Sequence, residues 1–364
     1  MTIFIILFIY LLLLKVFFEG RNSEKDRKKL SFLAGFGLWI VLALRSPYCG
    51  HDLVSGDLDS ANYVNIFSWV TEYSLIELFK GGLSYLSHME IGWFLYCKII
   101  TVIITNFQLF LAITALIEIS LIGFVLYKYS KDIVLSFIVF FSFGLYIISF
   151  SGLRQSVAFS LTFFSYYYLM EKKNVKFVLT VILASAIHTS AFIFLIAYPL
   201  KLVSFTTRKS LLLLCLVFIL LPVLSSLIDF IAPLLFGGRY LNFQDKGGAI
   251  TLFLLYAIIF VFYIKLNINN EYDNSYRGII LMAVFCQSLG YIGSGAITRI
   301  GFYFTIFFTL LFPKLVIGYS SKQSRGVCAF IISLLLLTYF WLVNKDGYLD
   351  VIPYYFFWEK PYLY

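Results

Sequence analysis

The segment that decides the fold reads SGLRQSVA at residues 151–158, a short polar stretch with one arginine between two strongly apolar runs. An arginine at the centre of a membrane helix costs about 2.5 to 3.5 kcal/mol on insertion scales. Arg154 is therefore expected either at a membrane interface or facing a polar cavity. The charges of the surrounding loops decide between these two places.

The apolar runs around this segment belong to a chain of 364 residues that is 61% hydrophobic and 13% charged, with a mean hydropathy of +0.91. No soluble globular class has this composition. Apolar runs follow one another with short polar gaps as far as residue 343. We predict an all-α polytopic integral membrane protein, a single membrane domain over residues 1–364, with about 11 to 13 transmembrane or re-entrant helices.

The charged and metal-binding residue types argue against several classes of function. The net charge of +9 lies in short loops between apolar runs, where basic residues set membrane topology, so no nucleic-acid partner is expected. Five cysteines show no CxxC spacing, which supports neither a disulfide framework nor a zinc site. The three histidines form no HExxH motif, and no Gly-rich phosphate loop is present. We expect no metal and no cofactor.

Basic loops assign the two membrane faces. Residues 19–29 form the densest basic loop and are predicted to be cytoplasmic. Residues 2–18 are then a retained first span that starts outside, because their basic residues follow the apolar run. A large outer loop is predicted at 45–88 and a smaller one at 236–248. The basic gap at 171–176 is again cytoplasmic, which puts Arg154 at the outer face.

The number of membrane crossings between Glu90 and Arg154 can be explained in two ways. Both residues are assigned to the outer face, yet three apolar runs separate them, whereas an even number of crossings is required. Residues 132–152, which contain Gly144, are therefore predicted to form a re-entrant hairpin that lines a cavity. Alternatively, residues 62–79 are a span and not a segment on the membrane surface.

Two more segments are expected to turn at the outer face. Residues 176–200 have basic residues at both ends and are predicted to be a hairpin with residues 185–190, including His188, at its outward tip. A histidine within the membrane is rare and usually faces a polar cavity. Residues 293–299 are predicted to be an outer turn that ends in Arg299.

Under this topology the unusual polar residues share the outer face. Several guanidinium groups without an equal number of buried carboxylates favour an anionic ligand, and their forked donors fit phosphate oxygens. A diphosphate on a lipid is the natural candidate, and a histidine is suited to act as general base, with a carboxylate as the alternative. The competing interpretation of each arginine is anchoring to lipid headgroups. The residues are Arg45, Asp52, Asp57, Asp59, Glu90, Arg154, Gln155, His188, Arg239 and Arg299.

Motifs at several places carry a resemblance to a known family. The segment GLRQSVA at 152–158 is followed, after a basic loop, by IHTSA at 187–191. The other matching features are Arg45-Ser46 ahead of Asp59 and Tyr63, EIGW at 90–93, and Arg299 with Tyr303. Over most of residues 45–304 the chain resembles the EpsG-like branch of the bacterial O-antigen and exopolysaccharide polymerases, the Wzy group.

The resemblance implies an inner-membrane glycosyltransferase with a GT-C-like helical bundle and an active site that faces the periplasm. Its donor and acceptor would both be undecaprenyl-diphosphate-linked oligosaccharides, with membrane lipid and a chain-length regulator protein as partners. A flippase of lipid-linked oligosaccharide and an O-antigen ligase are the alternatives. Inverted repeats mark many transporters, and the chain shows none.

The resemblance also implies the roles of single residues. His188, Asp59, Glu90 and Arg154 form the predicted catalytic set. Asp59 is favoured over Asp52 and Asp57 because a spacing of four places it on one helix face with Tyr63. The predicted diphosphate-binding set is Arg154, Gln155, Arg299, Arg45, Arg239 and Tyr63.

Overall fold

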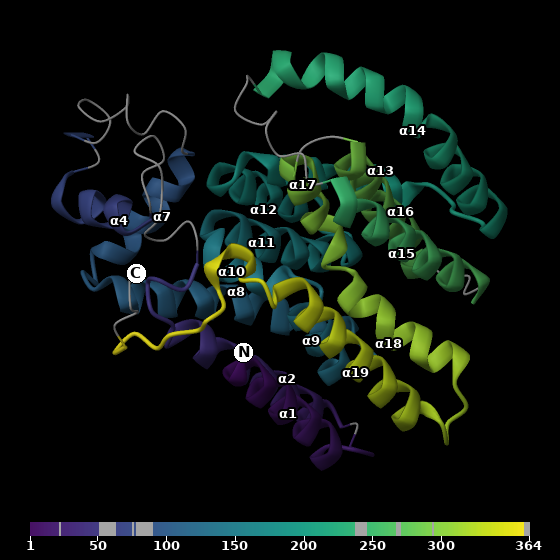
Figure 1. Cartoon of the computed structure of the whole chain (residues 1–364), viewed down its shortest axis with the longest axis horizontal. Helices are drawn as coiled ribbons and strands as arrows, with labels where there is room; N and C mark the ends of the chain where they lie inside the picture. The colour runs from purple at the N-terminus through teal and green to yellow at the C-terminus, as the bar shows by residue number, and fades with distance from the viewer. Residues whose placement is uncertain are drawn as a thin grey trace.

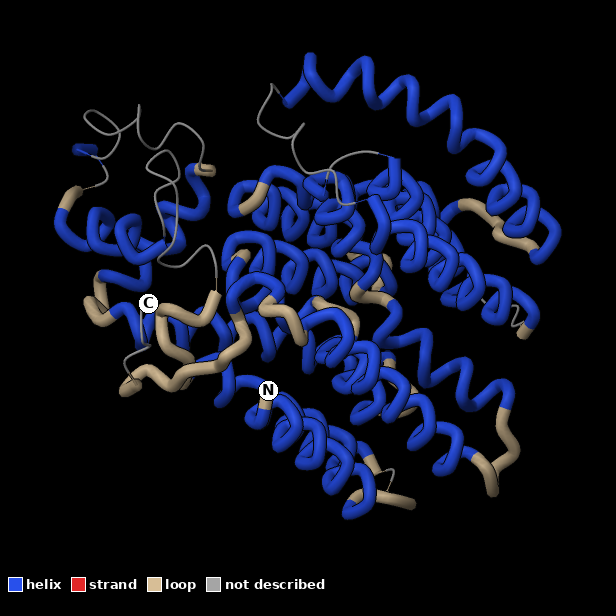
Figure 2. Tube along the Cα trace, viewed as in Figure 1, coloured by secondary structure: helices blue, strands red, loops and turns tan. Residues whose placement is uncertain are grey.

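The computed structural model describes residues 1–21, 23–50, 63–74, 76–77, 90–236, 246–266, 271–292 and 295–359. Over these residues the regular structure is helical, and the only β-type pairing is an isolated bridge between Arg45 and Phe356 (Figure 2). The predicted all-α class is confirmed.

The helices lie side by side in a bundle, with α1 and α2 at one edge and α14 at the opposite edge (Figure 1). Their bounds are α1 Thr2–Phe17, α2 Glu24–Ala43, α4 Tyr63–Glu72, α7 Ile91–Thr101, α8 Phe107–Tyr129, α9 Ile133–Ser142, α10 Leu145–Ser151, α11 Leu153–Met170, α12 Asn174–Ile187, η1 Thr189–Ile196, α13 Ala197–Leu202, α14 Thr207–Phe236, α15 Lys246–Lys265, α16 Glu271–Ile292, α17 Gly295–Thr305, α18 Phe308–Tyr319, α19 Arg325–Asn344 and η3 Tyr348–Asp350.

Several of these helices are suited to a membrane. Within the described residues, α8 and α19 are each long and apolar enough to cross one. Two pairs of consecutive helices are long enough only when taken together. Helices α9 and α10 meet at a bend of 55°, and the Arg299–Thr305 part of α17 meets α18 at a bend of 44°. If each pair counts as one span, the described residues contain two further spans. Shorter apolar helices such as α1, α7 and α12 accompany them. The chain is a polytopic helical membrane protein, and the total of about 11 to 13 helices stays a prediction.

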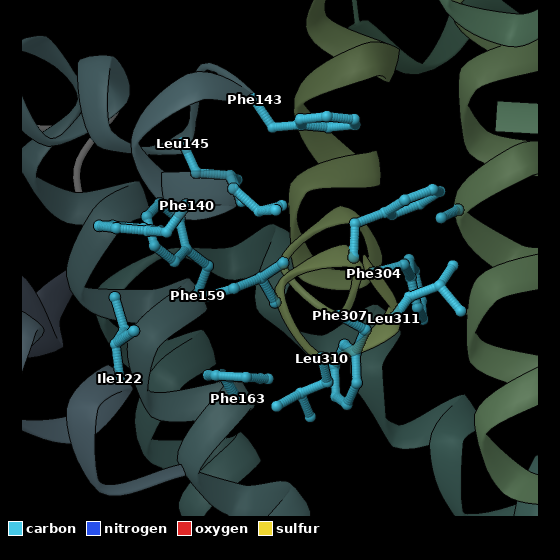
Figure 3. Packing of buried hydrophobic residues seen from close by; sticks show 14 of the residues in the cluster. Ile122, Phe140, Phe143, Leu145, Phe159, Phe163, Phe304, Phe307, Leu310 and Leu311 are labelled. Atoms are coloured by element: carbon cyan, nitrogen blue, oxygen red, sulfur yellow. The ribbon is translucent and has the colours of Figure 1, made fainter. Parts of the chain in front are cut away.

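The core is centred on α9 and α10, in which every residue is buried. Helix α9 contacts α1, α2, α18 and α19. Aromatic rings from α9, α11 and the start of α18 fill the space between these helices (Figure 3). Phe163 of α11, for example, meets Phe307 edge to face at 5.0 Å between ring centroids. Because protein surrounds α9 and α10, a break between them does not expose backbone polar groups to lipid.

The break between α9 and α10 occurs at Gly144, which has the left-handed backbone conformation φ 81°, ψ −12°. The prediction that residues 132–152 do not form one straight span is confirmed, whereas their re-entry on the outer side stays a prediction. The alternative, a span at 62–79, finds no support in α4, because its ten residues rise only about 15 Å.

Two predicted turns have different outcomes. Helix α12 ends at Ile187, His188 is extended, and η1 begins at Thr189, so the helix is interrupted at the predicted tip, whereas the hairpin and its outward direction stay predictions. The predicted turn at 293–299 is wrong from Gly295 onward, because α17 begins at Gly295 and includes Arg299. The physical reason is the helical spacing of the apolar residues at 297, 300 and 304.

Gly144→Ala is expected to destabilise the detergent-solubilised protein by about 1 to 2 kcal/mol, because a Cβ is strained in the left-handed region. Gly144→Asn should cost less, since asparagine adopts this conformation more readily. A thermal unfolding series measures both. Steric crowding is not a competing cause, because a Cβ at this position meets no atom within 4 Å. Equal melting temperatures for wild type and Gly144→Ala would contradict the expectation.

Candidate functional site

The ends of α7, α11 and α12 meet at one place and bring three charged or titratable side chains together. Glu90 precedes α7, Arg154 is the second residue of α11, and His188 follows α12. Arg154 Nη1 lies 2.5 Å from Glu90 Oε2, and His188 Nδ1 lies 3.2 Å from Glu90 Oε1. The side chains of Arg154, Glu90 and His188 keep 20%, 16% and 26% of their surface exposed, so a ligand can reach them.

The Glu90 carboxylate also caps the backbone beyond His188. Its Oε1 accepts hydrogen bonds from the Thr189 N–H at 2.9 Å and from the Thr189 hydroxyl at 3.2 Å. Burial alone would raise the pKa of Glu90, but the hydrogen bond from His188, the charge of Arg154 and the Thr189 N–H together lower it to about 2. Glu90 is therefore ionised near neutral pH, and it serves as an acceptor and counter-ion rather than as a proton carrier.

Tyr63 reaches the same place from α4. Its hydroxyl accepts from Arg154 Nε at 3.4 Å, and its ring meets Trp93 of α7 edge to face at 5.5 Å. Lys98 of α7 fixes the other end of α4 by donating to the carbonyls of Val70 and Tyr73 at 2.7 and 2.9 Å. Tyr63 and Arg154, which the sequence puts in the same predicted diphosphate-binding set, thus lie in contact, and Arg154 Nη2 is left without a partner among the described residues.

Helix α17 is tied to the same site by two hydrogen bonds. Gln155 Nε2 donates to the Arg299 carbonyl at 2.7 Å, and the hydroxyls of Ser190 and Tyr303 lie 2.9 Å apart. The backbone of Arg299 is therefore held next to α11, whereas its side chain is exposed. Within the described residues Arg299 has no ion-pair partner.

A glycine sets the distance between α7 and α12. A Cβ at Gly92 would lie 2.4 Å from the carbonyl oxygen of Ala186, which is closer than any side chain permits. Only glycine lets α7 approach α12 this closely, and this approach brings Glu90 to His188. The close packing of α7 against α12 therefore explains why the EIGW motif has a glycine at position 92.

Arg45 belongs to a second, buried cluster. Its guanidinium is only 1% exposed, donates to the Ser149 carbonyl at 2.6 Å and lies 4.9 Å from the centroid of the Phe150 ring. It also interacts electrostatically with Glu118, a carboxylate of α8 that is 1% exposed. Among the described contacts, none joins Arg45 to Arg154, so the structure places the two predicted phosphate ligands in different surroundings.

Glu118 was not among the residues predicted from the sequence. It accepts a hydrogen bond from the Ser149 hydroxyl and interacts electrostatically with the Ser156 hydroxyl. A signal was present, because Glu118 is the single acidic residue in an apolar run of 23 residues, and charges within a membrane span are rare and usually paired.

The outcomes for the predicted residues follow from these contacts. Glu90, Arg154, His188 and Tyr63 form one cluster, with Gln155 and the backbone of Arg299 beside it. Arg45 lies apart from it. The remaining predicted residues, Asp52, Asp57, Asp59 and Arg239, lie outside the described part of the chain.

The fold and this site define a polytopic helical membrane protein with a cluster of charged and titratable side chains where helix ends meet. The EpsG family profile matches residues 36–356, and the chain belongs to the EpsG family. No curated protein and no solved structure matches the chain. Family membership confirms the resemblance seen in the sequence and places the protein in polysaccharide biosynthesis.

Glu90→Gln is expected to destabilise the solubilised protein at neutral pH by about 2 kcal/mol, because the amide loses a charged hydrogen bond with Arg154. The pKa of Glu90 is about 2 in the folded protein and about 4.3 when unfolded. The carboxylate therefore stabilises the fold fully above about pH 5, and this stabilisation is lost as the pH falls toward about 2. Melting temperatures of both proteins over this pH range measure the effect.

The matched control is Glu171→Gln, which removes an exposed pair with Lys173 and should change stability by less than about 1 kcal/mol. A gap between wild type and Glu90→Gln that already narrows between about pH 8 and about pH 6 would contradict the low pKa of Glu90.

Gly92→Ala is expected to lower polysaccharide production at least about tenfold at equal protein level, because the added methyl group moves Glu90 away from His188. The control is Gly123→Ala, where a Cβ meets its nearest atom, Ser31 Oγ, at an ordinary 3.4 Å. Production should be unchanged in the control. Wild-type production by Gly92→Ala would show that the close approach of α7 and α12 is not needed.

Proposed function

We propose that this protein is a polymerase of the bacterial inner membrane that works at the periplasmic face. It transfers a growing polysaccharide from undecaprenyl diphosphate to the next lipid-linked repeat unit, as in O-antigen polymerisation. The observation that carries the proposal is the arrangement of Arg154, Glu90 and His188. It combines a fixed cation with a carboxylate-bound histidine in a chain of the EpsG family.

The contact with Glu90 fixes the role of each nitrogen of His188. An ionised carboxylate only accepts hydrogen bonds, so Nδ1 of His188 carries the hydrogen that lies between them. In the neutral ring the lone pair is then on Nε2. In the proposed reaction Nε2 takes the proton of the acceptor sugar hydroxyl while the oxygen of this hydroxyl attacks the anomeric carbon. Glu90 stabilises the imidazolium that forms.

The bond between the anomeric carbon and the diphosphate oxygen breaks in the same step, and its electron pair leaves with undecaprenyl diphosphate. Arg154 supports this departure, because its Nη2 has no partner among the described residues and the N–H groups at the start of α11 add partial positive charge. Arg299, exposed on α17 beside α11, offers a second cation. The donor is already activated, so the reaction needs no nucleotide at this face.

Deletion of the gene tests the reaction class through a gel of the surface glycan. Loss of a polymerase leaves lipid core that bears a single repeat unit. Loss of a ligase leaves core without glycan while polymer stays on the carrier lipid. Loss of a flippase leaves the lipid-linked repeat units on the cytoplasmic face of the membrane. We expect the first pattern, and either of the other two would overturn the proposal.

Complementation of the deletion strain tests the site. Arg154→Ala and His188→Ala should each leave the single-unit product, because they remove the cation and the base, whereas Arg208→Ala, an exposed residue of α14, should restore the full ladder. Arg154→Lys should restore little, since lysine cannot bind Glu90 and a phosphate oxygen with one planar fork. A full-length ladder from Arg154→Ala at normal protein level would show that the site assignment is wrong.

A further inference from the structure

The first turn of α11 connects the exposed site with the buried cluster. Three consecutive residues of this turn point in three different directions, because successive residues on a helix lie about 100° apart. Arg154 reaches Glu90 and Tyr63, and Gln155 reaches the Arg299 backbone. Ser156 reaches Glu118 of α8. The direction of Arg154 therefore depends on what holds Gln155 and Ser156.

Glu118 holds both sides of the break between α10 and α11. Ser149, in the last turn of α10, donates a hydrogen bond to its carboxylate, and the Ser156 hydroxyl, in the first turn of α11, interacts with it electrostatically. Between them Gly152 has the non-helical conformation φ −86°, ψ 63°. The Ser156 hydroxyl also lies 3.0 Å from the Leu153 carbonyl, so its single proton serves one acceptor at a time. The interaction with Glu118 competes with a purely local bond.

Arg45 holds the same turn of α10 from another direction. Its guanidinium donates to the Ser149 carbonyl at 2.6 Å and lies over the Phe150 ring. Ser149 is thus bound by Glu118 through its hydroxyl and by Arg45 through its carbonyl. Both charges are almost fully buried, and each is the electrostatic partner of the other.

The backbone around Arg45 is fixed by the surrounding chain. Gln108 Nε2 donates to the carbonyls of Ala43 and Arg45 at 2.6 and 3.0 Å. The Ser46 N–H donates to the Tyr355 carbonyl at 2.8 Å, and Arg45 bridges to Phe356. The Arg45 guanidinium therefore cannot move to a ligand unless the hydrogen bonds that hold the backbone of residues 43–46 are broken.

We infer that Glu118 and Arg45 are positioning residues: their contacts with the hydroxyl and the carbonyl of Ser149 fix the break at Gly152 and so direct Arg154 at the diphosphate, without touching substrate. The inference rests on the proposed function. It replaces direct phosphate binding, which the sequence predicted for Arg45, by action through Ser149 and Ser156.

The test measures the affinity of the purified full-length protein in detergent for undecaprenyl diphosphate. Glu118→Gln should weaken binding about tenfold, because it leaves the Arg45 charge without its partner. Arg45→Met should weaken binding similarly. The double variant Arg45→Met with Glu118→Gln has no buried charge left over and should bind more tightly than either single variant. If Arg45 binds the diphosphate directly, the double variant will bind no better than Arg45→Met, and the inference falls.

A pair of milder variants keeps the test decisive if the charge variants fail to fold. Ser156→Ala removes the interaction with Glu118. Ser160→Ala, one turn later, removes a buried hydroxyl whose one hydrogen bond within the described residues goes to the Val157 carbonyl. Ser156→Ala should weaken binding about threefold or more, and Ser160→Ala should leave it unchanged. Equal affinities of the two variants would overturn the inference.

Arg154→Ala separates this inference from the proposed function. If the wild type binds undecaprenyl diphosphate, Arg154→Ala does not and the Glu118 variants bind like wild type, only the positioning role is wrong. If the wild type does not bind, or Arg154→Ala binds equally well, the proposed function fails and the positioning role fails with it.

Discussion

A helix that ends among apolar groups must find new partners for the backbone groups it releases, and this constraint shapes the whole site. The break after α12 releases the Thr189 N–H, which Glu90 accepts at 2.9 Å. The break after α10 releases the Ser149 carbonyl, to which Arg45 donates at 2.6 Å. Charged side chains thus complete the interrupted helices. The breaks therefore place the Glu90 carboxylate and the Arg45 guanidinium close to the ends of α12 and α10.

The Glu90 carboxylate both completes the interrupted backbone and holds the charged and titratable side chains of the site. Its Oε1 caps Thr189 and contacts His188, and its Oε2 pairs with Arg154. A carboxylate that completes a backbone and neutralises a guanidinium stays ionised, which excludes it as a base near neutral pH. Because it is fixed by α7, it fixes both the cation and the imidazole relative to each other. Close packing at Gly92 makes this rigid.

The sequence predicts the all-α class, the interruption of residues 132–152 and the break at His188, because hydropathy and charge report directly on helices and loops. It also brings Glu90, Arg154, His188 and Tyr63 into one group, since their motifs carry the family resemblance. The prediction fails for the start of α17, where the helical spacing of the apolar residues at 297, 300 and 304 outweighs the turn tendency of the glycine-rich beginning. It misses Glu118, because one carboxylate in an apolar run does not reveal its partner on a distant helix.

The sequence predicts diphosphate binding for both Arg45 and Arg154, and the structure separates them by their burial and their partners. The side chain of Arg154 keeps 20% of its surface exposed and has one nitrogen without a described partner, so the anion of the proposed reaction can bind there without breaking a described contact. Arg45 is 1% exposed and committed to Ser149, Phe150 and Glu118. A buried charge that loses its partner costs several kcal/mol, about 3 to 5. A ligand that competed for Arg45 would first have to break the contact of Arg45 with Ser149 of α10. An exposed arginine supported by a buried one is therefore the arrangement in which binding an anion leaves the fold intact.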